Sequence, residues 1–181
     1  MAEQRLPPTF KLPASRKLRP IQQGELDGLC GIYSLINAIR LVKFEAGALQ
    51  SIESEALFSL AVYRLANTGD LRERLCTGVP WGVLKQVGQR MAKGASEESV
   101  QLRVTPIKRG QSDRMALIKR HLLSGSPVIA SVHRNQHYTV LTGWTPTRAV
   151  IFDSSGSHWV PLESIERTLC LAVSVCDVER I

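Results

Sequence analysis

The cysteine in the segment QQGELDGLCGIYSLINAI has surroundings that suit covalent chemistry. A polar loop that contains glycine carries Cys30 onto the first turn of a helix predicted over residues 29–43. Unpaired amides and the positive end of the helix dipole stabilise a thiolate at such a position. Cys30 is therefore a candidate nucleophile, although a single cysteine at a helix start can equally be a buried structural residue.

Four neighbours of Cys30 could assist a reaction. Gly28 and Gly31 carry no side chains beside the sulfur, which would let a substrate backbone approach closely. Gln22 and Gln23 lie shortly upstream, and a carboxamide beside the Cys30 amide would make a two-donor oxyanion hole. The sequence leaves open which glutamine, if either, does so. Each of these residues is also common in ordinary helix entries and on surfaces.

A cysteine nucleophile needs a base, and His137 is the best candidate because it begins the apolar strand HYTVLTGW. His133, at the end of the preceding strand, is the second candidate. His121, within a helical segment, and His158, in a polar turn, are expected to be structural.

Asp153 ends the next predicted strand, RAVIFD, where it could orient the His137 ring. A hairpin loop with an odd number of residues, such as 145–147, would pair Asp153 with Thr139 and place it on the same face as His137, within side-chain reach. An even-numbered loop would place Asp153 on the opposite face, unless a bulge intervened. The predicted triad of Cys30, His137 and Asp153 depends on this register.

Three segments, DGLCGIYSLINAI, QHYTVLTGW and VIFDSSG, resemble the Cys, His and Asp blocks of the papain-like cysteine peptidase superfamily, in particular bacterial peptidases of the kind that process bacteriocin leaders. The similarity covers most of residues 20–175. It implies Cys30 as nucleophile, His137 as base, Asp153 as orienting acid and a glutamine before the cysteine as oxyanion donor.

The resemblance also implies an α+β fold, in which a helical lobe with a buried Cys helix packs against an antiparallel sheet and the active site lies in the cleft between them. One departure is that the glutamine of the superfamily usually stands one residue closer to the cysteine than Gln23 does. The DGLC segment also resembles the Asp-Gly-x-Cys of ovarian-tumour-type deubiquitinases, in which loop backbone near the Asp supplies the oxyanion contacts.

Periodicity predicts a helical half followed by a strand-rich half, within one domain. Trp81 and Met91 belong to an apolar helical stripe that we expect in the core. Trp159 could form a wall of the cleft near Asp153, although a core position is more common for tryptophan. Short connectors imply antiparallel pairing. The predicted helices are 29–43, 52–66, 80–94 and 113–125, with one helical turn in 161–168, and the predicted strands are 100–104, 128–133, 137–143, 148–153, 158–160 and 169–175.

Composition limits the possible classes. The chain has 181 residues and 44% hydrophobic content, as expected of one folded domain. Residues 1–20 hold five cations and one acid, so 5 − 1 = 4 of the net charge of +7 lies there. We therefore predict a basic, Pro-containing N-terminal arm over 1–20, solvated or loosely packed, and a papain-like domain over 21–181. The remaining +3 argues against nucleic acid as a partner.

The sequence has no 18-residue apolar run and no secretory signal, so we expect no membrane partner and a cytoplasmic location, or export without a classical signal peptide. Cys30, Cys76, Cys170 and Cys176 have no metal-site spacing and are expected to be thiols. His133 and His137 lie four residues apart, but on strands, where their rings would not share a helical face. We expect no metal and no cofactor.

These observations favour a thiol hydrolase that cleaves an amide bond, peptide or isopeptide, of a protein or peptide substrate through an acyl-enzyme. A glutamine deamidase or an acyltransferase could use the same triad, because only the leaving group and the acceptor differ. The non-enzymatic alternative is a catalytically silent binding or inhibitor module, whose basic arm engages an acidic partner.

Overall fold

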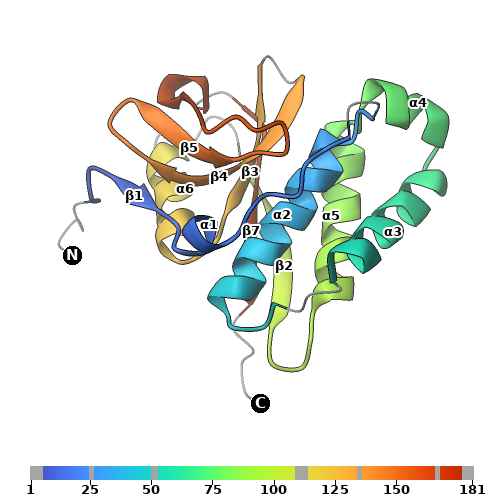
Figure 1. The fold of residues 1–181 in the computed structure, drawn as a ribbon, viewed down its shortest axis with the longest axis horizontal. Coiled ribbons are helices and arrows are strands. Elements are labelled where there is room, and N and C mark those ends of the chain that lie inside the picture. Colours follow the sequence, from blue (N-terminus) through green and yellow to red (C-terminus); the bar gives the residue numbers. More distant parts are fainter. Residues whose placement is uncertain are drawn as a thin grey trace.

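The computed structural model describes residues 6–24, 27–49, 53–108, 114–133, 136–165 and 168–176. A helical lobe lies beside a twisted sheet (Figure 1). The lobe consists of α2 (Cys30–Glu45), α3 (Glu53–Ala66), α4 (Leu71–Thr77) and α5 (Trp81–Ala95). The N-terminal elements are β1 (Phe10–Lys11) and α1 (Ala14–Lys17), and α6 (Arg114–Leu123) covers the far face of the sheet in Figure 1.

The sheet has the strand order β2-β7-β3-β4-β5-β6, and β1 pairs with the end of β4. Every pair is antiparallel, which confirms the predicted α+β class. The strands are β2 (Gln101–Ile107), β3 (Val128–Val132), β4 (His137–Trp144), β5 (Arg148–Phe152), β6 (Trp159–Pro161) and β7 (Cys170–Cys176), with a 3-10 turn, η1 (Leu162–Ile165), between β6 and β7.

Helix α2 is apolar nearly all round because it is covered on two sides, by β4 and by α3 and α5. Its buried polar side chains are each hydrogen-bonded, as burial in a low-dielectric interior requires. Ser34 Oγ donates to the Tyr138 carbonyl at 2.9 Å, which ties α2 to the start of β4. Asn37 bonds both the amide and the carbonyl of Ile21, at 2.8 and 3.2 Å, and so ties α2 to the chain that precedes it.

The N-terminal segment, residues 6–24, is packed against the body of the protein and is not the loosely packed arm expected from its charge. Strand β1 pairs with Trp144 and Gly143 of β4, and the Trp144 indole donates to the Pro7 carbonyl at 3.1 Å. Leu12 and Ala14 are fully buried. The sequence pattern did not predict this packing, because only a few apolar residues, interspersed with cations and prolines, make the contacts with the body of the protein.

Helix α4 was not predicted, because its seven residues, LRERLCT, include no buried side chain and therefore show no apolar period. Asp70 caps it by accepting hydrogen bonds from the amides of Arg72 and Glu73 at 2.8 and 3.2 Å. Ser51 and Ser112, which the sequence suggested as caps of other helices, lie outside the described residues.

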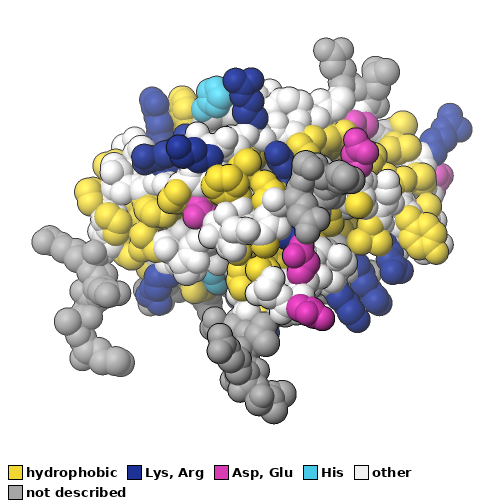
Figure 2. All heavy atoms as spheres, turned by 60° about the horizontal axis from the view of Figure 1, so that its bottom comes forward, with side chains coloured by type: hydrophobic (Ala, Val, Ile, Leu, Met, Phe, Trp, Pro, Cys, Tyr) yellow, Lys and Arg dark blue, Asp and Glu magenta, His cyan; other side chains and the backbone are white. Residues whose placement is uncertain are grey.

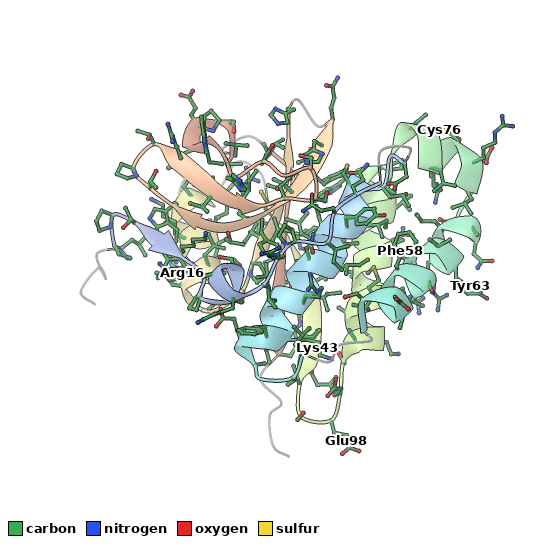
Figure 3. All side chains as sticks on the ribbon, viewed as in Figure 1. Arg16, Lys43, Phe58, Tyr63, Cys76 and Glu98 are labelled. Atoms are coloured by element: carbon green, nitrogen blue, oxygen red, sulfur yellow. The ribbon has the colours of Figure 1, made fainter. Side chains whose placement is uncertain are left out.

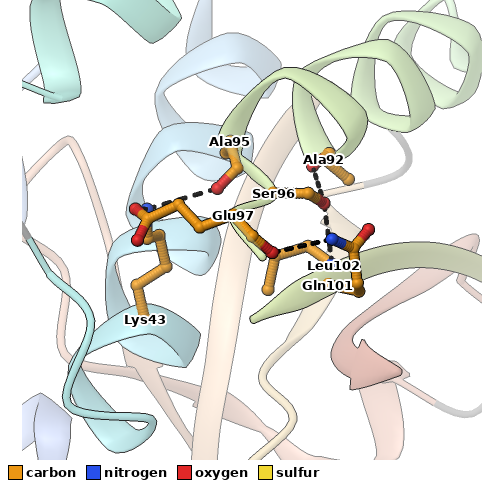
Figure 4. Close-up of polar contacts among 7 residues, drawn as sticks. All are labelled: Lys43, Ala92, Ala95, Ser96, Glu97, Gln101 and Leu102. Atoms are coloured by element: carbon orange, nitrogen blue, oxygen red, sulfur yellow. Dashed lines mark hydrogen bonds and ion pairs between the residues drawn. The ribbon is translucent and has the colours of Figure 1, made fainter. Parts of the chain in front are cut away.

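A buried ion pair fixes the lower end of the helical lobe (Figure 4). Lys43 of α2 is 1% exposed at its side chain and donates to Glu97 at 2.5 Å and to the Ala95 carbonyl at 3.2 Å. Glu97 itself is 37% exposed. The pair joins α2 to the turn between α5 and β2, and hence joins the helical lobe to the far edge of the sheet.

This asymmetric burial predicts unequal effects of removing the two partners. Glu97→Ala removes a carboxylate that lies 2.5 Å from the buried ammonium of Lys43 and should cost about 3 kcal/mol in the free energy of unfolding. Lys43→Met removes the buried charge and lets Glu97 hydrate, so it should cost less than about 1 kcal/mol. Urea unfolding of both variants measures the difference. A larger loss for Lys43→Met than for Glu97→Ala would contradict this account.

Candidate active site

Cys30 is the first residue of α2, as predicted, and it is 8% exposed. The loop before it is held by Asp27, whose Oδ1 accepts from the Leu29 amide at 2.9 Å and whose Oδ2 accepts from the Tyr33 hydroxyl at 3.4 Å. The sulfur therefore lies at a helix start, where amides of the first turn have no partner four residues earlier. The Ile32 amide donates to the Leu29 carbonyl at 2.8 Å, so the amides of Cys30 and Gly31 are the ones that can face a negative charge on sulfur or on a bound oxygen.

His137 begins β4, and its Nε2–H donates to Asp153 Oδ2 at 2.8 Å. Its side chain is 21% exposed, whereas that of Asp153 is fully buried. Cys30 and His137 line the same cleft, and the interaction with Cys30 contributes to the raised pKa of His137. Because Nε2 is engaged by Asp153, Nδ1 is the ring nitrogen left to face the sulfur. The structure thus brings together the three residues that the sequence predicted as a triad.

The contacts of Asp153 fix its carboxylate. Oδ1 accepts from the Ser155 amide at 2.7 Å and also from the Ser155 hydroxyl. Burial by itself would raise the pKa of Asp153, but the hydrogen bonds from His137 and Ser155, with a contribution from Thr139, lower it to about 2. Asp153 is therefore ionised throughout the neutral range and can hold the imidazole in one orientation.

The hydrogen bond to Asp153 is the main reason that the pKa of His137 is raised, to about 10. The interaction with Cys30 adds to it, and burial opposes it. His137 is consequently an imidazolium at neutral pH in the resting protein.

The register that places Asp153 beside His137 comes from a β-bulge. At the hairpin end Trp144 pairs with Ala149, a register that would put Asp153 on the wrong face. The register shifts between Leu141 and Gly143, and from there inward Val140 pairs with Phe152. The hairpin therefore does not have the pairing that a loop with an odd number of residues would give. The bulge that the sequence analysis allowed as the alternative brings Asp153 opposite Thr139.

A cleft of about 670 Å³ opens onto Cys30 and His137. Gln23 lines this cleft and Gln22 does not, because successive side chains of the extended chain point to opposite sides. The Gln23 carboxamide donates to the Asp27 carbonyl, and its own amide donates to the Ser154 carbonyl at 3.0 Å. The walls of the cleft are formed by Gln23, Gly28, Cys30, residues 76–81, residues 136–138 and Leu169.

The two glycines near Cys30 serve mainly to pack elements together. A Cβ on Gly28 would lie 2.8 Å from the Gly78 amide nitrogen, and the Gly28 amide donates to the Leu75 carbonyl at 2.6 Å. A Cβ on Gly31 would lie 2.8 Å from Leu84 and 3.1 Å from Tyr138. Gly28 does line the cleft, but Gly31 is buried between α2, α5 and β4.

The aromatic residues of the cleft differ from those expected. Trp81, predicted as core, lines the cleft and stacks on Tyr138, with ring centroids 6.2 Å apart. Burial, together with the charge of Cys30, raises the pKa of Tyr138 to about 12. Trp159 lies on β6, 48% exposed and beneath the Arg148 guanidinium, and it is neither in the core nor on the cleft.

Cys76 is a cleft residue that sequence reasoning did not single out. It lies near the end of α4, the end closer to the beginning of α2 (Figure 3), and it is exposed. All four cysteines are described, and none forms a disulfide. No signal in the sequence marked Cys76, because α4 itself had no apolar period.

The other histidines are placed as follows. His133 is exposed at the end of β3 with φ 49°, and its ring centroid is 6.3 Å from that of His137. Burial lowers the pKa of His121 on α6, and His158 is exposed beyond β5. Within the described ranges, no three His, Cys, Asp or Glu side chains are grouped as metal ligands, and no helix has the length and apolarity needed to cross a bilayer.

A scan against protein-family models found no match, and a search of curated proteins found none either. Solved structures do match. A putative C39-like peptidase from Bacillus anthracis aligns with a TM-score of 0.57 and 17% identity, covering 90% of this chain and 97% of that one. A double glycine motif protease from an AMS/PCAT transporter, crystallised with the leader peptide, aligns with a TM-score of 0.50 and 17% identity over 88% and 91% of the two chains.

The cysteine protease CMS1MS2 of Carica candamarcensis, solved with E-64, aligns with a TM-score of 0.48 and 15% identity over 94% of this chain and 98% of that one. The first two alignments span nearly the whole of each chain. The chain therefore shares the fold of the C39-like peptidase and the double glycine motif protease, which is the α+β arrangement that the sequence resemblance implied.

The raised pKa of His137 predicts how stability depends on pH. Its stabilising contribution is complete below the unfolded value of about 6.5 and is lost as the pH rises through about 10. The contribution of Asp153 is complete above about 3.8 and is lost as the pH falls through about 2. NMR titration should find His137 protonated at pH 8, and Asp153→Asn should lower its pKa toward 6.5.

His121 provides the internal reference for this titration, because it lies on α6 and has no contact with Asp153. Its pKa should be the same in the wild type and in Asp153→Asn. If the His137 resonance titrated near 6.5 in the unmodified protein, the ion pair described above would be absent in solution.

Proposed function

We propose that the protein is a thiol hydrolase that cleaves an amide bond, in a peptide or isopeptide, with Cys30, His137 and Asp153 as its catalytic triad. The observation that carries the proposal is the position of the His137 ring, which is bonded through Nε2 to a buried carboxylate and lines the same open cleft as Cys30. A silent binding module would not need a buried carboxylate aimed at a histidine next to a cysteine.

The reaction begins with His137 as an imidazolium in the same cleft as Cys30. The imidazolium and the helix start both stabilise negative charge on sulfur, which makes Cys30 the nucleophile. Asp153 holds the imidazolium in place through its 2.8 Å bond to Nε2, leaving the Nδ1 proton directed at the cleft. Asp153 thus orients the ring and keeps its charge.

Attack of the thiolate on the substrate carbonyl forms the carbon–sulfur bond and moves the π electrons onto oxygen. The Cys30 amide and the Gln23 carboxamide are the two donors we assign to this oxyanion. His137 then gives its proton to the leaving amine as the carbon–nitrogen bond breaks, which leaves a thioester on Cys30. In the second half, neutral His137 takes a proton from water as it attacks, and the acid product and the thiolate are released.

A peptide substrate is supported by the shape of the cleft and by the nature of the structural neighbours. The cleft has a volume of about 670 Å³, and the stacked rings of Trp81 and Tyr138 give it an aromatic surface. Two of the matching structures are named as a protease and a peptidase, and the former was crystallised with a leader peptide. We propose that this chain also takes an extended peptide across Cys30.

The proposal predicts selective alkylation of Cys30. At pH 6, iodoacetamide should label Cys30 at least about tenfold faster than Cys76, although Cys76 is the more exposed thiol. His137→Ala should bring the Cys30 rate down to that of Cys76, because the stabilising imidazolium is gone. Mass spectrometry of time points maps the labelled residue. Equal, slow labelling of all four cysteines in the unmodified protein would refute a thiol enzyme.

The two glutamines offer a matched pair of variants for the oxyanion hole. Gln23→Ala should lower kcat about 100-fold, since one oxyanion donor is lost. Gln22→Ala removes the same group from the other side of the same chain and should leave kcat unchanged within about twofold. The rates are measured with a fluorogenic peptide amide selected from a library with the unmodified enzyme. Equal losses in the two variants would show that neither carboxamide acts as the donor.

A further inference from the structure

A second hollow of about 470 Å³ lies on the other side of the chain that carries the two glutamines. We call it the basic hollow. One wall is the N-terminal segment, from Lys11 to Gln22, and the other is formed by Ile151–Asp153 and the loop at Gly156–His158. It shares no lining residue with the catalytic cleft.

The charge of this hollow is positive. Lys11 and Arg19 line it from the N-terminal segment and His158 from the loop, and all three are exposed. The described part of the segment, residues 6–24, contains no acidic residue. Asp153, on the floor, is already engaged by His137 and Ser155 and its charge is offset by the imidazolium. Figure 2 shows Lys and Arg side chains gathered beside a histidine over the half of the molecule that holds the sheet.

The wall formed by the N-terminal segment is fixed in place. The Leu12 amide donates to the Thr142 carbonyl at 2.7 Å, and the Ala14 amide donates to Glu45 at 2.6 Å. Further along, the Arg40 guanidinium donates to the Arg19 carbonyl at 3.0 Å. These bonds fix the backbone that carries Lys11 and Arg19, so the wall does not have to be ordered when a ligand binds, which lowers the entropic cost of binding.

The lining also includes the half-buried Leu18 and two residues of β5, Ile151 and Phe152, that are 6% and 5% exposed. The volume of the hollow is in the range of pockets that hold a molecule of several functional groups, and well beyond what a single small anion fills. Cations at the rim and the apolar side chain of Leu18 suit a ligand that carries both carboxylates and a hydrophobic group. We propose that the basic hollow binds an acidic peptide segment, with glutamate or aspartate next to a large apolar residue, supplied by a partner protein.

A ligand in the hollow would touch the same chain that lines the cleft. Gln22 faces the hollow and Gln23, the next residue, faces Cys30. The Gln23 amide is also bonded to the carbonyl of Ser154, the residue after Asp153. A ligand bound in the basic hollow would therefore affect the positions of both Gln23 and Asp153. This coupling rests on the proposed function, whereas the binding itself does not.

The binding is tested with an acetylated, amidated peptide of sequence Glu-Phe-Glu-Leu and its neutral counterpart Gln-Phe-Gln-Leu, by calorimetry on the full chain. The acidic peptide should bind and the neutral one should bind at least about tenfold more weakly, because charge-assisted hydrogen bonds to Lys11 and Arg19 are lost. Amide resonances of Gln23 and Ser154 should shift on titration. No detectable binding of the acidic peptide would overturn the proposal.

A matched pair of double variants locates the site. Lys11→Gln with Arg19→Gln removes the two cations that line the hollow and should weaken binding by at least about tenfold. Arg16→Gln with Lys17→Gln removes the same charge from exposed positions of the same segment that do not line it, and should change affinity less than about threefold. Equal weakening by both would mean a diffuse basic surface and would refute a site in the hollow.

Two further probes separate the ligand classes. Inorganic phosphate, or a short single-stranded oligonucleotide, that bound more tightly than the acidic peptide would overturn the assignment of a peptide ligand. Calorimetry and NMR report on binding without any turnover. If the acidic peptide did not bind but Cys30 was labelled rapidly by iodoacetamide, this inference alone would be rejected. If the peptide bound but Cys30 was labelled slowly, only the proposed thiol hydrolase would be rejected.

Discussion

The contact between the first turns of α2 and the start of β4 is the constraint on which the rest of the structure depends. Cys30 comes from α2 and His137 from β4, so the two can meet only if the helix and the strand are held at close range. The Ser34 hydroxyl on the Tyr138 carbonyl provides one tie, and the absence of a side chain at Gly31 lets Leu84 and Tyr138 pack against the helix. Burial of nearly every α2 residue between the sheet and the helical lobe makes this position rigid.

Around that contact, two polar networks place the remaining groups. A buried carboxylate, held by Ser155 and bonded to His137, sets the charge and the direction of the imidazole. On the helix side, Asp27 organises the loop into Cys30, and its carbonyl accepts the Gln23 carboxamide. Asp27 and Ser155 thus position groups within a few residues of themselves, whereas His137 is held by Asp153 from the end of the neighbouring strand.

The N-terminal segment links the two sides of the molecule. It pairs with the end of β4, crosses the sheet, is held by Asn37 of α2, and ends in Gln22 and Gln23, which face different cavities. Its cations remain outside because only the short apolar side chains between them are buried. A segment that looks like a solvated tail by composition is therefore a wall of both the cleft and the basic hollow.

The sequence by itself determined the order of most of the elements, the buried helix that begins at Cys30, and the three residues of the candidate triad, because local apolar periods and short polar motifs are properties of neighbouring residues. The sequence could not decide whether Asp153 would face His137, since that depends on a β-bulge in the pairing of β4 with β5. Nor could it choose between Gln22 and Gln23, recognise Trp81 and Cys76 as cleft residues, or foresee that residues 6–24 pack on the sheet. Each of these follows from contacts between segments distant in the chain, whose energies no local pattern carries.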